Sequence, residues 1–137
     1  MPKLLALDYG KKNTGIAVTD DLQIIASALS TLPTNELINF LKNFLSNENV
    51  EKIIIGKPIQ KDGNPSEIET EILKFIKDLQ HIFPYLIIER FDERYTSKMA
   101  FNIMINSGIN KNKRKNKLLI DKIAATIILQ DYLQYKK

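Results

Sequence analysis

The sequence predicts an α/β fold in which one five-stranded mixed sheet carries helices on both faces. Three short segments of extended character come first, and units of helix followed by strand come after them. Strands joined by short polar links favour an antiparallel meander, whereas strands joined through helices favour parallel pairing by crossover connections. The expected order of elements is therefore βββαβαβαα, in a single domain that covers residues 1–137.

The meander is expected at residues 3–9, 14–20 and 23–31. Apolar residues dominate these segments, and Gly10 and Gly15 bracket the first polar link. Glycine is the usual residue in tight turns because it adopts backbone conformations that other residues avoid. The first two strands should therefore form a hairpin.

The pattern changes to a helical one after Pro33. Thr34 stands where a helix N-cap is expected. The apolar positions that follow fall on one helical face: Leu37, Ile38, Leu41, Phe44 and Leu45. The apolar segment 52–55 then fits a short buried strand.

A second helix–strand unit follows. Ser66 and Glu69 have the spacing of a capping box. The predicted buried stripe of this helix is Ile68, Ile72, Phe75, Ile76 and Leu79. A strand is expected at 85–91, a third helix from Thr96 or Ser97 to about Gly108, and a last helix at 118–133.

Composition excludes several kinds of site. The chain of 137 residues has no cysteine, which excludes disulfides and thiolate ligands or nucleophiles. The single histidine, His81, lies near the end of a predicted helix, where a surface position is expected. Neither a signal peptide nor a segment of membrane-spanning length is evident, so we expect a cytoplasmic protein that does not contact membranes.

Basic residues are concentrated in one segment. The net charge is +4, and residues 110–117 read NKNKRKNK without an acidic residue. Lys113, Arg114 and Lys115 would directly precede the last helix. Such a segment attracts phosphate groups; the alternative is a solvated loop without a ligand.

Three acidic residues occupy positions where a charge is costly. Asp8 ends the first apolar strand, and Glu93 follows the strand at 85–91 on the side opposite to its two neighbours. Asp121 shares a helical face with Ala124, Ala125, Ile128 and Tyr132. An ionised carboxylate is expensive to bury without a partner. Each acid alone could be explained by capping, backbone hydrogen bonds or an ion pair, but the three together indicate a shared site.

A divalent cation would hold three such carboxylates together. Hard cations prefer oxygen ligands, so Mg²⁺, or Mn²⁺ in its place, is expected, with two ions at the site. Two metal ions beside cationic side chains suit the hydrolysis of phosphodiester bonds. The predicted substrate is therefore a nucleic acid.

Four motifs together resemble one protein family. The segments LDYGKKNTGIAVTD, IIIGKPIQKDG, FDERYTSKMA and LIDKIAATIILQDYL are similar to the YqgF/RuvX family of ribonuclease H-like nucleases. The resemblance implies the ribonuclease H-like fold and catalytic, metal-binding roles for Asp8, Glu93 and Asp121. It also implies processing of the 5′ end of the pre-16S rRNA, association with the small ribosomal subunit, and a monomer or homodimer. The family has also been described as Holliday junction resolvases, and branched DNA is then the substrate.

Further residues are candidates for nucleic-acid binding. They are Lys12, Lys57 and Arg94, in addition to the three basic residues before the last helix. The family usually has an arginine where this chain has Asn13, and an apolar residue at Lys57. Arg94 could equally pair with Asp92 or Glu89.

Two other classes of protein remain open. The Asp8–Gly10 strand and turn also resemble the first phosphate loop of actin-like and sugar-kinase-like ATPases, although those need two lobes. The other alternative is a nucleic-acid-binding module of the same fold without catalysis.

Overall fold

The computed structural model describes residues 2–58, 67–92 and 113–136; within the last range, the side chains of 123–135 are described. Five strands form one sheet in the spatial order β3-β2-β1-β4-β5. Their bounds are β1 Lys3–Asp8, β2 Asn13–Thr19, β3 Ala26–Pro33, β4 Val50–Lys57 and β5 Ile87–Asp92. Pairing is antiparallel among β1, β2 and β3, whereas β4 runs parallel to both β1 and β5. The predicted mixed sheet is confirmed.

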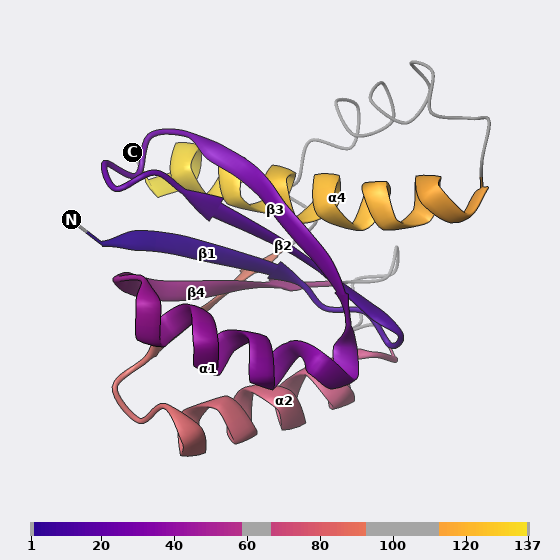
Figure 1. The fold of residues 1–137 in the computed structure, drawn as a ribbon, viewed down its shortest axis with the longest axis horizontal. Helices are drawn as coiled ribbons and strands as arrows, with labels where there is room; N and C mark the ends of the chain where they lie inside the picture. The colour runs from indigo at the N-terminus through magenta and orange to yellow at the C-terminus, as the bar shows by residue number, and fades with distance from the viewer. Residues whose placement is uncertain (1, 59–66, 93–112, 137) are drawn as a thin grey trace.

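Helices cover both faces of this sheet, as Figure 1 shows. One face carries α1, Leu37–Asn47, and α2, Glu69–Ile82. The other face carries α4, Lys113–Lys136, which runs back across the sheet from the end at which β1 finishes. The result is a three-layer arrangement with the sheet in the middle.

Each face of the sheet has its own core. The predicted stripes of α1 and α2 pack on one face, where the fully buried residues include Leu5, Leu7, Leu41, Ile53, Ile55, Ile72 and Leu79. Small and apolar residues pack beneath α4 on the other face: Leu4, Ala6, Ala17, Ile54, Phe91, Ala125, Ile128, Leu129 and Tyr132 are among them. Because side chains alternate along a strand, β1 sends Leu5 and Leu7 to one core and Leu4 and Ala6 to the other.

The last helix begins earlier than predicted. Residues 113–117, expected to belong to a basic loop, form the first turns of α4, which also continues past 133 to Lys136. Lysine and arginine are good helix formers, and neither glycine nor proline separates them from Leu118. The prediction of a loop from the charge pattern was therefore wrong. Lys113, Arg114 and Lys115 lie within the helix that carries Asp121.

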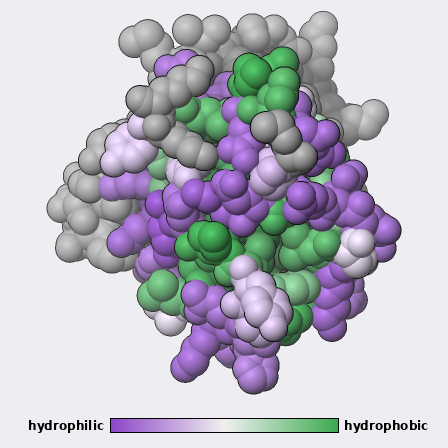
Figure 2. Space-filling model, turned by 90° about the vertical axis from the view of Figure 1, so that its left-hand side faces the viewer, coloured by the Kyte–Doolittle hydropathy of each residue, from purple (hydrophilic) through white to green (hydrophobic). Residues whose placement is uncertain are grey.

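The third strand begins later than predicted, at Ala26 instead of residue 23. A turn occupies the preceding residues, in which the Asp20 Oδ1 atom accepts hydrogen bonds from the backbone N–H groups of Ile24 and Ile25, at 2.8 and 2.9 Å. Gln23 has a φ of 57°, which is in the left-handed region. The apolar residues of this turn remain exposed instead of entering the sheet: Leu22, Ile24 and Ile25 are each about 60% exposed. Figure 2 shows hydrophobic residues among hydrophilic ones on this end of the molecule.

Smaller differences concern the other strands. β4 extends beyond 52–55 at both ends, and β5 begins at Ile87 instead of residue 85. A turn precedes β5, because the Leu86 N–H donates to the Phe83 carbonyl at 3.0 Å. His81 is exposed near the end of α2, as predicted. The predicted third helix, residues 96–108, and Ser66 of the predicted capping box lie outside the described residues.

Within the described ranges, no helix is both long enough and apolar enough to cross a membrane.

Candidate active site

Three strands bring polar residues to the same end of the sheet. Asp8 is the last residue of β1, Lys57 the last of β4 and Asp92 the last of β5. The strands are in parallel register, with Leu7 opposite Ile55 and Lys57 opposite Asp92. The carboxyl ends of parallel strands are where open α/β sheets usually bind ligands. This end of the sheet is therefore the candidate active site.

The alternation of side chains separates these residues between the two faces. Asp8 has the parity of Leu4 and Ala6, which pack beneath α4. Lys57 has the parity of Ile53 and Ile55, which pack beneath α1 and α2. Asp8 therefore belongs to the α4 face, and Lys57 belongs to the opposite one.

The same reasoning applies to β5. Phe91 packs in the core beneath α4, whereas Arg90 contacts Glu69 of α2 on the other side. Asp92 follows the parity of Arg90 and so does not share the face of Asp8. Glu93 and Arg94 lie outside the described residues.

Asp121 occupies a position on the inner stripe of α4. It stands one helical turn before Ala125, which is fully buried against the sheet. Ile128 and Tyr132 continue the same stripe at spacings of three and four residues. The side chains of Asp121, Lys113, Arg114 and Lys115 lie outside those that the structure describes, so their roles remain predictions.

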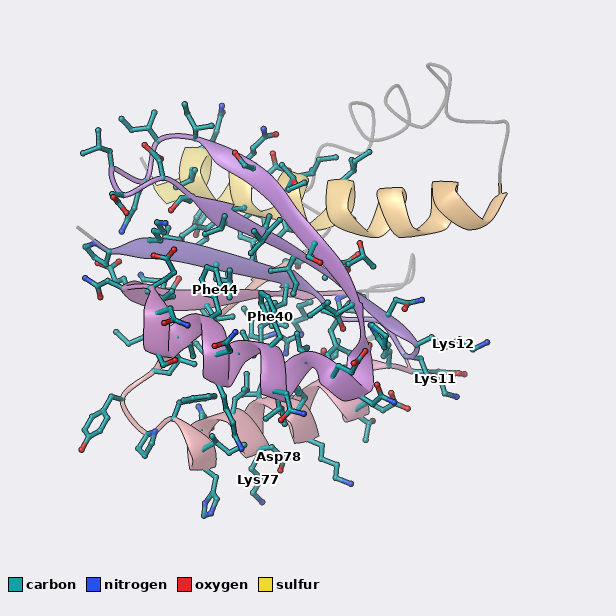
Figure 3. All side chains as sticks on the ribbon, viewed as in Figure 1. Lys11, Lys12, Phe40, Phe44, Lys77 and Asp78 are labelled. Carbon is teal, nitrogen blue, oxygen red and sulfur yellow. The ribbon has the colours of Figure 1, made fainter. Side chains whose placement is uncertain are left out.

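The turn after Asp8 is fixed by Thr34. The Thr34 hydroxyl donates to the Gly10 carbonyl at 2.6 Å, and the Thr34 N–H donates to the Lys12 carbonyl at 2.8 Å. The buried Thr14 hydroxyl lies 2.8 Å from that of Thr34. A Cβ on Gly10 would lie 2.3 Å from the Asn13 carbonyl oxygen, so only glycine fits there. Lys11 and Lys12 extend outward from this turn, as Figure 3 shows.

These contacts correct the expected role of Thr34. It begins a 3₁₀ turn, η1, Thr34–Glu36, and makes no side-chain capping hydrogen bond to that turn. Its hydroxyl instead holds the loop that follows Asp8. The sequence pattern identified a polar residue after Pro33 but could not distinguish a cap from a bond to a distant turn.

A partly buried ion pair supports the carboxyl end of β4. The guanidinium nitrogens Nη1 and Nη2 of Arg90 donate to the two carboxylate oxygens of Glu69, at 2.8 and 2.7 Å. Arg90 also donates to the carbonyls of Ile55 and Gly56, at 3.2 and 3.0 Å. It therefore joins the first turn of α2 to the ends of β4 and β5. This pair was not predicted from the sequence. The available signal was Arg90 itself, a charged residue within a strand that also contains the apolar Phe91.

A second polar network joins α4 to the sheet away from the candidate site. The Lys52 ammonium lies 2.7 Å from a carboxylate oxygen of Glu89, and the Tyr132 hydroxyl donates to the other oxygen at 2.6 Å. The hydrogen bond to Glu89 raises the pKa of Lys52. Burial, followed by the hydrogen bond to Glu89, raises the pKa of Tyr132. The folded protein thus holds both protons more tightly than the unfolded chain does.

This network predicts a loss of stability in alkali. Because both pKa values are raised, their contribution to the free energy of unfolding is complete below about pH 10 and is lost as the pH rises through them. Tyr132→Phe should lower stability at neutral pH by about 1 kcal/mol and make the alkaline decline shallower. Urea unfolding between pH 7 and 11 measures both effects. Tyr85→Phe, at a position 97% exposed, is the control and should change neither. An alkaline decline equally steep in Tyr132→Phe would contradict the assignment.

The donor chemistry at the candidate site suits a hard cation. Asp8 supplies a carboxylate at the end of β1, and oxygen donors are those that Mg²⁺ prefers. Among the residues whose side chains are described, no three carboxylate or imidazole groups gather to hold a metal. Two of the three predicted ligands, Glu93 and Asp121, fall outside that set.

Comparison with known proteins decides the family. The model of the family described as "RuvX: Holliday junction resolvase" matches residues 2–135. The chain belongs to the RuvX family. A protein of Flavobacterium johnsoniae named "Putative pre-16S rRNA nuclease" is 54% identical over 100% of this chain and 99% of its own length. A relative with the same name from Bacteroides thetaiotaomicron is 48% identical over 100% of this chain and 99% of its own length.

Solved structures confirm the ribonuclease H-like fold of this RuvX family member. The chain is similar to Thermus thermophilus RuvC in complex with a Holliday junction substrate, with a TM-score of 0.61 and 13% identity over 100% of this chain and 98% of that one. It is also similar to the fowlpox virus Holliday junction resolvase, with a TM-score of 0.53 and 18% identity over 98% and 99% of the two chains. At these identities the similarity shows the fold alone. The family match favours a nuclease over the phosphate-loop ATPase alternative.

Proposed function

We propose that this protein is a metal-dependent nuclease that processes the 5′ end of the pre-16S rRNA. The observation that carries the proposal is the full-length similarity to relatives of that name, combined with Asp8 at the carboxyl end of β1 on the face covered by α4. Hydrolysis of a phosphodiester bond needs a charged, structured site, and this end of the sheet supplies one. The same proposal places the protein in the cytoplasm. It includes association with the small ribosomal subunit and a monomeric or homodimeric state.

Three carboxylates would form the catalytic centre. Asp8 has the parity of the α4 face, and Glu93 is the next position of the same parity after Phe91. Asp121 stands one turn before Ala125 on the stripe of α4 that packs on this face. From alternation and helical spacing we infer that all three acids lie on one side of the sheet. Asp92, by contrast, is assigned to the other side.

These residues would hold Mg²⁺ or Mn²⁺, in two sites. Bound there, the ions supply Lewis acidity and an activated water for phosphodiester hydrolysis. The protein's own contribution is position. β1 lies at the centre of the sheet, and the contacts from Thr34 to Gly10 and Lys12 fix the turn that follows Asp8. A fixed carboxylate loses little conformational freedom when it binds a cation.

Basic residues would position the substrate strand. Lys12 extends from the turn after Asp8, and Lys113, Arg114 and Lys115 begin the helix that carries Asp121. Arg94 follows Glu93 in the sequence. Contacts to phosphates position a nucleic acid without selecting its sequence. Lys57 has the parity of the opposite face, so it would contact a part of the substrate beyond the edge of the site.

The second candidate function is resolution of branched DNA. The description of the family and the fold shared with two Holliday junction resolvases favour it. A binding module without catalysis would retain the same fold and basic residues. The three candidates differ in what happens to RNA and DNA in the presence of metal.

Depletion of the protein in its host separates these functions. Mapping of rRNA ends should show accumulation of 16S precursor with an extended 5′ end, and expression of the wild-type gene should restore the mature end. Normal rRNA ends together with unresolved recombination intermediates would contradict the proposal and support the resolvase. Recombinant protein that binds precursor RNA but leaves it intact with Mg²⁺ and with Mn²⁺ would support the binding module.

A further inference from the structure

A groove of about 490 Å³ lies at the same end of the sheet as Asp8, between α1, α2 and the β1–β2 turn. The proposed catalytic centre does not use it. Residues of four kinds line it, aromatic, apolar, polar and charged: Tyr9 and Lys11 of the turn, Thr34, Asn35 and Ile38 of η1 and α1, and Glu71, Lys74, Phe75 and Asp78 of α2. Its volume is within the range of sites for small ligands and is suited to one nucleotide, not to a duplex.

Two aromatic rings form one part of this groove. The ring centroids of Tyr9 and Phe75 lie 5.1 Å apart with an interplanar angle of 42°. Phe75 is buried in the core beneath α1 and α2, whereas Tyr9 is only half-buried. Tyr9 therefore presents aromatic surface to the groove on a rigid support. Bases of single-stranded nucleic acids stack on aromatic side chains of this kind.

The charges around the groove are balanced. Lys11 and Lys74 line it together with Glu71 and Asp78, and none of these four forms an ion pair with another described residue. Glu71 and Asp78 line the groove from α2, four residues before and three residues after Phe75, whose ring packs on that of Tyr9. Two carboxylates disfavour a phosphate group inside the groove. They accept hydrogen bonds from the N–H groups of a neutral base.

The groove is next to the proposed catalytic centre along the chain but on the other face. Tyr9 directly follows Asp8 and packs against the core beneath α1 and α2, whereas Asp8 has the parity of the α4 face. Lys11 and Lys12 belong to the turn that joins β1 to β2, and both extend into solvent in Figure 3. Lys11 also lines the groove. A single strand of nucleic acid that passes over this turn would reach both faces of the sheet.

We propose that the groove is a subsite for one unpaired nucleotide of the substrate strand, with its base against Tyr9 and its phosphate outside, next to Lys11. This proposal rests on the proposed nuclease function, because it identifies the strand as the substrate. It adds a requirement for single-stranded character on one side of the cleaved bond. Lys57 has the parity of Ile53 and Ile55, so it belongs to the face of the sheet on which the groove lies.

Binding measured without metal tests the subsite separately from cleavage. The probe is a six-nucleotide single-stranded RNA. It is titrated into ¹⁵N-labelled full-length protein, and the amide shifts are followed by NMR. In parallel, the Kd is measured from the fluorescence anisotropy of the same RNA carrying a fluorescent label. Amide shifts are expected at Tyr9, Lys11, Asn35 and in the first half of α2. Tyr9→Ala should raise the Kd about 5- to 100-fold, and Tyr9→Phe, which keeps the ring, should stay within about 3-fold of wild type. Tyr85→Ala, at the opposite end of the molecule, should leave the Kd unchanged.

A pair of lysine variants keeps the test valid if Tyr9→Ala fails to fold. Lys11→Ala should reduce the slope of log Kd against log salt by about 0.7, because one phosphate contact is lost. Lys77→Ala removes the same charge from an exposed position of α2 that does not line the groove, and should leave the slope unchanged.

Three outcomes overturn the subsite. They are wild-type affinity in both Tyr9→Ala and Lys11→Ala, equal losses in Tyr9→Phe and Tyr9→Ala, and amide shifts that omit the groove. Cleavage of precursor RNA by a protein that shows any of these outcomes would reject the subsite and leave the nuclease function standing. RNA bound in the groove by a protein that cleaves no nucleic acid would support the subsite and reject the nuclease function.

Discussion

Asp8→Asn should abolish cleavage of precursor RNA and leave the fold intact. An amide is a poor ligand for a hard cation, and loss of several kcal/mol of charge stabilisation in the transition state corresponds to a rate about 10³-fold lower. Asp8 is half-buried at the end of β1 and is not part of either hydrophobic core. Substitution by a residue of nearly the same shape should therefore preserve packing. Single-turnover cleavage with Mg²⁺ measures the effect.

Thermal unfolding provides the second half of this prediction. Without metal, the three carboxylates of the proposed centre would repel one another, so Asp8→Asn should unfold at the same temperature as wild type or at a slightly higher one. Mg²⁺ should raise the melting temperature of wild type, because the ion binds the folded state preferentially, and should do so much less for the variant. Calorimetric scans with and without Mg²⁺ decide this.

Asp92→Asn is the matched control for Asp8→Asn. It removes the same charge from the last residue of a parallel strand, but the parity of Asp92 is that of the α2 face. Cleavage by this variant should stay within a few-fold of wild type. Wild-type cleavage by Asp8→Asn, or unfolding of that variant, would refute the role of Asp8 as a metal ligand.

The order of elements was predictable because hydrophobic periodicity controls it. Leu5 and Leu7 alternate with Leu4 and Ala6 between two cores, and a run of apolar residues in an extended segment is what burial on both faces of a sheet requires. The stripe from Leu37 to Leu45 likewise needs only helical spacing. Asp8 could be chosen as a site residue for a related reason, since it interrupts an apolar strand shortly before a glycine.

Contacts between residues distant in sequence were not predictable. Thr34 holds the carbonyl of Gly10 from twenty-four positions away, and Arg90 reaches Glu69 across twenty-one. Neither contact leaves a periodic pattern, because each depends on where two elements meet in space. The predicted start of α4 was wrong for a different reason. Local helix propensity favours a helix at residues 113–117, whereas their high charge density favours a loop.

Arg90→Met should cause the largest loss of stability among the substitutions considered. The Glu69 side chain is only 8% exposed, so removal of its partner leaves a charged carboxylate with little access to water. The carbonyls of Ile55 and Gly56 lose their donors at the same time. Removal of one partner from a buried pair costs about 3 to 5 kcal/mol. Urea unfolding followed by circular dichroism measures the free energy of unfolding.

A double-mutant cycle separates the ion pair from simple packing. Glu69→Met combined with Arg90→Met leaves no isolated charge, and should recover most of the stability lost in Arg90→Met, because an apolar pair often replaces a buried ion pair at little cost. The comparison is the pair between Lys3 and Glu48, whose nitrogen and oxygen lie 3.5 Å apart and whose acidic side chain is 42% exposed. Glu48→Gln should change the free energy of unfolding by less than about 1 kcal/mol. A loss below that same limit in Arg90→Met, or a double variant less stable than Arg90→Met, would show that Arg90 does not hold α2 to the carboxyl end of the sheet through Glu69.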